Sequence, residues 1–201
     1  MDNPEIVWLN TKIAAATQGD DDAFTQLVDR FQTPVFNLCY RMLGDYTEAE
    51  DAAQESFWRA FQSLKRYDQK RPFVTWLLSI SAHYCIDQLR KRHLITLPMD
   101  ILPEEEAPDP APSPETCVTK AEENRSLRLL LAKLGPQDRA AIILRYWYEL
   151  SEDEIAQALS LTVSAVKSRL HRSRLELAHL WQVRQSPDVQ VIRRPHESPA
   201  I

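Results

Sequence analysis

Residues 150–177 read LSEDEIAQALSLTVSAVKSRLHRSRLEL, and this stretch indicates the fold of the C-terminal half of the chain. Ser151 and Glu154 have the spacing of a capping box, in which two side chains satisfy backbone N–H groups at a helix start. The box predicts a short helix through Leu159. The break SLTV then separates it from a longer helix that ends near Trp181. A short helix, a tight turn and a longer helix form a helix-turn-helix.

The segment SAVKSRLHRSRL, residues 164–175, is strongly basic within an acidic protein. It holds four Lys or Arg residues and one His but no Asp or Glu, whereas the chain has a formal net charge of -5. The spacing of Val166, Leu170 and Leu177 places them on one inward helix face. The outward face is then expected to hold Ser164, Lys167, Ser168, His171 and Arg174, with Arg169 and Arg172 beside it. Such a face suits base edges and phosphates of DNA; the alternative is a solvated basic face.

An acidic, proline-rich segment separates two helical halves. Six prolines lie between Pro98 and Pro114, and residues 96–124 hold eight acidic residues and one basic residue. Too few apolar side chains are present to offset the entropy of ordering, so we expect an extended linker over 97–119. Fully extended, this linker spans about 80 Å.

The predicted fold class is all-α, with two small helical domains. We expect an N-terminal domain at 1–96, the linker at 97–119, a C-terminal domain with the helix-turn-helix at 120–182, and a disordered tail at 183–201. The N-terminal helices are expected to begin at Pro4, near Phe24, at Pro34, at a Thr47–Glu50 capping box and near Phe73, with Gly19 and Gly44 ending the first and third. Two further helices are expected at about 120–134 and 136–149.

Composition excludes several classes of protein. No run of eighteen apolar residues is present, and the N-terminus MDNPEIVW lacks the pattern of a signal peptide. Cys39, Cys85 and Cys117 form no CxxC pair, which indicates idle thiols in a reducing cytosol rather than a metal site. We therefore expect a cytoplasmic protein without a membrane segment, metal or cofactor.

Cations alternate with aromatic residues in the segment KRYDQKRPF, residues 65–73, and beyond it. Trp76, Tyr84 and the cluster RKR at 90–92 follow. This mixture can hold single-stranded nucleic acid, with phosphates on the charges and bases on the rings. The alternative is that Trp76 and Tyr84 belong to the core.

An acidic run follows the helix that begins near Thr47. Its members are Asp45, Glu48, Glu50, Asp51 and Glu55. Paired carboxylates could serve acid–base catalysis or a metal, but no Glu-x-x-His motif, nucleophile elbow, P-loop or zincin motif accompanies them. A solvated or partner-binding helix face is the better interpretation, and we expect no enzymatic activity.

Three stretches together resemble the extracytoplasmic-function (ECF) sigma factors, the small two-domain members of the main bacterial sigma family. EAEDAAQESFWRAF at 48–61 is similar to the helix with which that family binds core polymerase. RPFVTWLLSISAHYCIDQLRKR at 71–92 resembles its promoter-melting segment, and residues 150–177 resemble its helix-turn-helix. The order of these stretches around a linker makes the resemblance specific.

The resemblance implies a sigma factor that directs core RNA polymerase to one promoter class and helps to melt the −10 region. The implied partners are the clamp helices and flap of core polymerase, promoter DNA and an anti-sigma factor. The expected contacts with core polymerase are Asp51, Gln54, Glu55 and Trp58. Those with the −10 element are Arg66, Lys70, Arg71, Trp76, His83 and Arg90, with a flipped base in the loop 66–72. Those with the −35 element are Ser164, Lys167, Ser168, His171, Arg172 and Arg174.

Two positions depart from the family pattern. His83 stands where the family often has an Asn that engages the −10 strand, and Ser160 stands where its turn often has Gly. A left-handed conformation at Ser160 would cost about 1 kcal/mol. One rival hypothesis is a one-component regulator, which would need a ligand pocket or a dimer surface within 1–95. The other is a helical enzyme, which no sequence motif supports.

Overall fold

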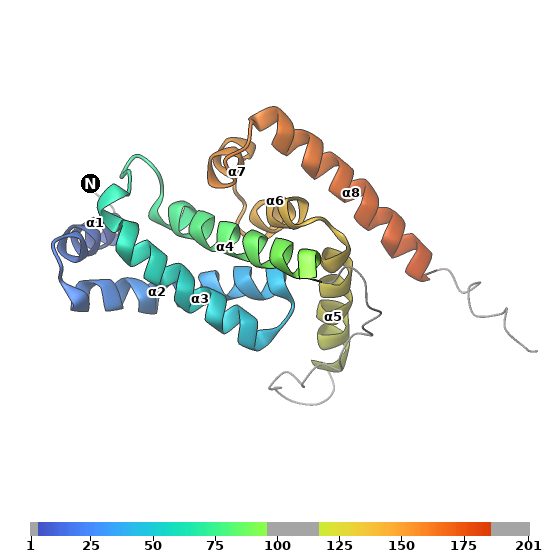
Figure 1. The fold of residues 1–201 in the computed structure, drawn as a ribbon, viewed down its shortest axis with the longest axis horizontal. Coiled ribbons are helices and arrows are strands. Elements are labelled where there is room, and N and C mark those ends of the chain that lie inside the picture. Colours follow the sequence, from blue (N-terminus) through green and yellow to red (C-terminus); the bar gives the residue numbers. More distant parts are fainter. Residues whose placement is uncertain (1–3, 96–116, 186–201) are drawn as a thin grey trace, which may run out of the picture.

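The computed structural model describes residues 4–95 and 117–185, which form helices and turns without a strand (Figure 1). The N-terminal half contains α1 (Pro4–Thr17), α2 (Asp21–Leu43), α3 (Tyr46–Ser63), the 3₁₀ turn η1 (Leu64–Arg66) and α4 (Phe73–Ile95). The C-terminal half contains α5 (Cys117–Lys133), α6 (Pro136–Trp147), α7 (Glu152–Ala158) and α8 (Val163–Gln185). The all-α prediction is confirmed for these residues. None of the helices described is both long and apolar enough to cross a membrane.

Two helices extend across the expected domain limits. Helix α5 begins at Cys117, three residues inside the expected linker, and α8 continues to Gln185, past the expected domain end at 182. Residues 96–116, which hold most of the predicted linker, and residues 186–201 of the predicted tail lie outside the described residues.

The N-terminal core is built around α2, which packs against α1, α3 and α4. Long apolar side chains fill its centre, among them Leu27, Leu38, Met42, Leu77 and Leu78. Helix α3 meets this core through small residues, namely Ala49, Ala52, Ala53, Ser56 and Ala60, all buried. The Ser56 hydroxyl donates to the Ala52 carbonyl at 2.6 Å, so this buried polar group is satisfied within the helix.

Two predictions for this half were wrong. The second and third expected helices are one helix, α2, with Pro34 inside it. A proline within a helix removes one backbone donor, but burial of Leu27, Val35 and Leu38 on the same helix holds its two parts together. The cap of α3 is Asp45, whose Oδ1 accepts from the Glu48 N–H at 2.8 Å, and not the predicted Thr47–Glu50 box.

The two halves pack against each other. Helix α4 contacts α6 and α7, and α2 contacts α5 and α6. In Figure 1, α6 and α7 lie along the upper side of α4, while α3 lies on its other side. The surfaces expected to read the two promoter elements therefore belong to domains that touch in this structure.

Candidate nucleic-acid and polymerase interfaces

The helix-turn-helix forms as predicted. The Ser151 hydroxyl accepts from the Glu154 N–H at 3.2 Å, and Glu154 Oε2 accepts from the Ser151 N–H at 2.8 Å, which completes the capping box. The Ser151 N–H and the Ser151 hydroxyl both donate to Glu154 Oε2, the hydroxyl at 2.7 Å, and these two bonds lower the pKa of Glu154. In the turn, Ser160 adopts a left-handed conformation with φ 55°, as its replacement of a family glycine suggested. Thr162 Oγ1 then accepts from the Ala165 N–H at 3.2 Å near the start of α8.

Helix α8 is fixed in rotation by its buried face. Val166 and Leu170 are buried against the C-terminal core, and Leu177 is half-buried there. On the flank, Arg169 donates to Asp138 Oδ1 at 2.7 Å and to Gln137 Oε1 at 2.8 Å. Arg169 thus ties α8 to the first turn of α6, and it is not a free cation beside the outward face.

All six residues predicted for the −35 element are exposed on α8. They are Ser164, Lys167, Ser168, His171, Arg172 and Arg174. Lys167 Nζ lies 3.6 Å from Glu152 Oε2, so an exposed ion pair joins α8 to the start of α7. Leu175 also lies on α8, is 60% exposed, and is not among the residues predicted from the sequence. An exposed apolar group can contact a thymine methyl.

A second surface lies between the end of α3 and the middle of α4. A hollow of about 510 Å³ is lined by Arg59, Gln62, Ser63, Arg66, Ser79, Ile80 and His83. Arg66 and His83, both predicted for the −10 element, are brought together there. His83 Nδ1 lies 2.8 Å from the Ser79 carbonyl, which can only accept, so Nδ1 carries the hydrogen and Nε2 remains available to a ligand.

The loop before α4 is held by aromatic packing. The rings of Tyr67, Phe73 and Trp76 lie with centroids 5.1 to 5.5 Å apart. Burial raises the pKa of Tyr67, whose hydroxyl donates to the Arg71 carbonyl. Trp76 is half-buried in this cluster, so the core alternative holds in part and the ring is not a free stacking surface.

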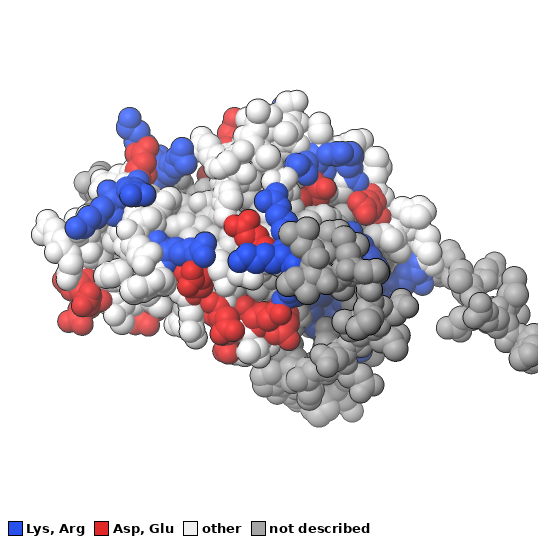
Figure 2. Space-filling view, viewed as in Figure 1, with Lys and Arg blue, Asp and Glu red and all other residues white. Residues whose placement is uncertain are grey.

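The remaining cations of this surface are exposed. Lys70 and Arg71 lie in a turn in which Asp68 Oδ1 accepts from the Lys70 N–H at 3.0 Å and the Asp68 carbonyl accepts from the Arg71 N–H at 3.0 Å. Arg90 lies two turns beyond His83 on α4, 3.7 Å from Asp87. Figure 2 shows Lys and Arg side chains over the upper left, near this loop, and over α8, whereas acidic side chains gather along the lower edge under α2 and α3.

The third surface is the outer side of α3. Asp51, Gln54 and Trp58 are exposed and spaced i, i+3 and i+7, and the Trp58 side chain is 57% exposed. Glu55 is half-buried and accepts from Arg59 Nε at 2.7 Å. An exposed indole among polar residues is typical of a protein interface.

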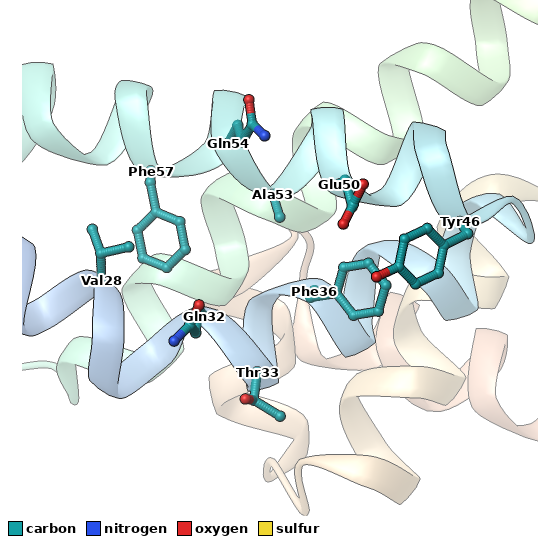
Figure 3. Close-up of a pocket in the computed structure, with 9 residues that line it drawn as sticks. All are labelled: Val28, Gln32, Thr33, Phe36, Tyr46, Glu50, Ala53, Gln54 and Phe57. Atoms are coloured by element: carbon teal, nitrogen blue, oxygen red, sulfur yellow. The ribbon is translucent and has the colours of Figure 1, made fainter. Parts of the chain in front are cut away.

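A groove of about 540 Å³ runs beside this surface between α2 and α3. Figure 3 shows its lining residues, Val28, Gln32, Thr33, Phe36, Tyr46, Glu50, Ala53, Gln54 and Phe57. The rings of Phe36 and Tyr46 lie 5.2 Å apart at one end of the groove. Gln54 lines the groove and is also one of the predicted polymerase contacts. The sequence did not predict the groove.

Comparison with known proteins assigns both halves. Residues 27–94 match the family Sigma-70 region 2, and residues 124–177 match Sigma-70, region 4. The chain is 36% identical over 179 residues to the ECF RNA polymerase sigma factor SigW of Bacillus subtilis, covering 83% of this chain and 92% of that protein. The chain belongs to the ECF RNA polymerase sigma factors.

Two further relatives agree with this assignment. The ECF sigma factor SigE of Mycolicibacterium smegmatis is 34% identical over 82% of this chain, which spans 63% of that longer protein. The solved structure of CnrH in complex with the cytosolic domain of CnrY is 25% identical, with a TM-score of 0.64 over 86% of this chain and 96% of that chain. This sigma factor is therefore a promoter-specific initiation factor of RNA polymerase. The comparisons favour a sigma factor over the rival hypothesis of a one-component regulator.

Arg59 of this sigma factor is also not among the site residues predicted from the sequence. Its guanidinium bonds Glu55, lies 4.8 Å from the centre of the Tyr84 ring, and lines the hollow that contains Arg66 and His83. The i, i+4 spacing from Glu55 was the available signal. Arg59 connects the predicted polymerase surface with the predicted −10 surface.

The left-handed turn residue provides a test of the helix-turn-helix. Ser160→Gly should raise the free energy of unfolding by up to about 1 kcal/mol, because glycine adopts φ 55° without strain. Ser168→Gly, the same change within α8, should lower it by about 0.5 kcal/mol. Urea denaturation of both variants measures the contrast. Destabilisation by Ser160→Gly would show that the turn is not strained.

The aromatic cluster provides a test of the −10 loop. Trp76→Ala should lower the free energy of unfolding by about 2 kcal/mol, because a half-buried ring is lost from its packing with Tyr67 and Phe73. Arg71→Ala should change it by less than about 0.5 kcal/mol, since this side chain is exposed. Thermal unfolding distinguishes the two. Unchanged stability of Trp76→Ala would place the indole on the surface.

Proposed function

We propose that this sigma factor uses the three surfaces as the family resemblance implied, with the outer side of α3 on the clamp helices of core polymerase. The hollow and loop between α3 and α4 hold the melted −10 strand, and the outward face of α8 reads the −35 element. The observation that carries the proposal is spatial: the predicted residues, apart from the half-buried Glu55 and Trp76, are exposed on three surfaces, and buried residues of the same helices fix their directions.

The −10 surface suits single-stranded DNA chemically. Arg59 and Arg66 supply positive charge on one side of the hollow, and His83 Nε2 supplies a polar atom on the other. Exposed Lys70 and Arg71 extend the charge along the loop. A strand with phosphates on these cations and an unstacked base in the hollow would favour the melted form of the promoter.

We further propose an anti-sigma factor as a partner and the cytoplasm as the place of action. CnrH, a solved structural relative, is seen in complex with the cytosolic domain of CnrY. The groove between α2 and α3 is lined by apolar and aromatic side chains beside polar ones, as a surface for a partner helix requires. The proposed role is that of an initiation factor without catalysis of its own, with the flap of core polymerase as a further proposed partner.

The polymerase surface is tested by one charge reversal. Asp51→Lys should weaken binding to core polymerase at least about tenfold, because the carboxylate lies on the proposed contact face and is exposed. Asp29→Lys makes the same charge change on α2 at a residue that does not line the groove. Binding is measured by titrating labelled protein with core enzyme. Equal affinity of the Asp51→Lys variant and the wild type would refute the placement.

The −35 surface is tested by separating base contacts from phosphate contacts. With holoenzyme and a promoter pool randomised at the −35 element, His171→Ala should change the selected bases, each lost contact costing about 1–3 kcal/mol. Arg172→Ala should weaken all sequences similarly and reduce the salt slope by about one unit. Sequencing of bound DNA at several salt concentrations provides the measurement. The reverse pattern would mean that the reading face of α8 is rotated toward Arg172.

A further inference from the structure

Leu175 lies in line with the polar residues of α8 that are proposed to read the −35 element. At about 100° per residue, four side chains of α8 fall within a sector of about 60°. They are Ser164, Ser168, His171 and Leu175. Leu175 is 60% exposed, more than any other large apolar side chain in the described part of the chain. The outward face of α8 therefore carries an apolar group one turn beyond His171.

The buried side of α8 keeps Leu175 in this direction. Val166, Leu170 and Ser173 lie on the opposite side of the helix and are buried, with exposed fractions of 0%, 5% and 2%. Leu177, two residues beyond Leu175, packs against the core. Turning Leu175 inward would expose Val166 and Leu170 to water, which the hydrophobic effect opposes. The outward direction of Leu175 thus follows from the packing of the whole helix.

The two arginines beside Leu175 leave it uncovered. Arg172 Nε donates to the Ser168 carbonyl at 3.4 Å. Arg174 Nε donates to the Leu170 carbonyl at 3.2 Å. Both carbonyls lie one turn nearer the start of α8, so both side chains extend toward the start of the helix. With these cations on phosphates, which position a protein on DNA, the leucine faces the base pairs.

An exposed leucine on a face that reads DNA has one matching partner among the base edges of the major groove. Thymine presents its C5-methyl group there, whereas adenine, guanine and cytosine present hydrogen-bond donors and acceptors. A leucine side chain has no polar atom, so contact with those groups would remove their water without replacing it. Contact with a methyl group removes water from two apolar surfaces, which is favourable. The side chain thus favours thymine at the base pair that it faces.

We propose that Leu175 is a specificity-determining residue that contacts a thymine methyl group in the −35 element. The inference rests on the proposed function, because it requires that α8 lie in the major groove. Leu175 is four residues, or about 6 Å, beyond His171 along the helix axis. With base pairs about 3.4 Å apart, the thymine lies within about two base pairs of the one that His171 reads.

Replacement of thymine by uracil tests the contact without changing the protein, because uracil lacks only the methyl group. The probe is a promoter that carries the −35 sequence selected by the holoenzyme from the randomised pool. Each thymine of this element, on either strand, is replaced in turn, and affinity is measured by titrating labelled promoter with holoenzyme. One replacement should weaken binding of the wild type about three- to fivefold, the loss expected for one buried methyl group.

Leu175→Gln assigns the methyl effect to this residue. Glutamine has a similar helix propensity but a polar end, so the variant should bind the thymine and uracil promoters equally. A second variant, Leu175→Ser, should give the same result by removing most of the side chain. The matched control is Leu129→Gln, the same change at a 48% exposed leucine of α5, which should keep the wild-type ratio. Because each protein is compared with itself on two DNAs, a general loss of stability leaves this ratio unchanged.

Two results would overturn the proposal. Wild-type binding that no replacement of thymine weakens, or a selected −35 element without thymine, would show that Leu175 reads no methyl group. A methyl effect that persists in both Leu175 variants would assign the contact to another residue. A holoenzyme that prefers no −35 sequence would overturn the proposed function instead, because α8 would then read no bases at all.

Discussion

The close approach of α3 to α2 and α4 is the constraint on which the rest of the N-terminal domain depends. It requires a stripe of small residues, and α3 supplies Ala49, Ala52, Ala53, Ser56 and Ala60 at helical spacing. Because this stripe is buried, the other side of α3 must face solvent. The exposed positions of Asp51, Gln54 and Trp58, and that of Arg59 at the edge of the hollow, follow from the same rotation. A larger residue in the stripe would displace both candidate surfaces together.

In the C-terminal domain, side-chain hydrogen bonds as well as buried residues fix the rotation of a helix. A single stripe of Val166 and Leu170 would leave α8 free to roll slightly on its core, but Arg169 is held by Asp138 and Gln137 on α6. Fixing the rotation matters because a recognition helix must present particular side chains to a groove. The basic segment that stands out in an acidic chain thus contains cations with distinct roles: one positions the helix, and the others face solvent.

The sequence predicts what depends on local spacing. The Ser151–Glu154 cap, the turn at Ser160 and the buried face of α8 all follow from residues a few positions apart, and the structure contains them. The sequence could not show that α2 continues through Pro34, since packing against distant helices decides between a kink and a break. The sequence placed the cap at Thr47, whereas the hydrogen bond that Asp45 accepts from the Glu48 N–H makes Asp45 the cap. Contacts between the domains, such as that of the Tyr148 hydroxyl with the Pro34 carbonyl, have no local signal.

The pair Glu55–Arg59 illustrates why exposed sites tolerate such local contacts. Glu55 belongs to the predicted polymerase surface and Arg59 lines the hollow of the predicted −10 surface, yet they bond each other at 2.7 Å. Both side chains remain more than a third exposed, and exposed i, i+4 pairs contribute only about 0.3–0.5 kcal/mol. Either residue can therefore exchange this partner for polymerase or a DNA phosphate at small cost. Arg139 is the contrasting case, because a buried guanidinium needs carbonyl acceptors at all times. The exposed pair can therefore rearrange during binding, whereas the buried arginine is held by acceptors in both halves of the chain.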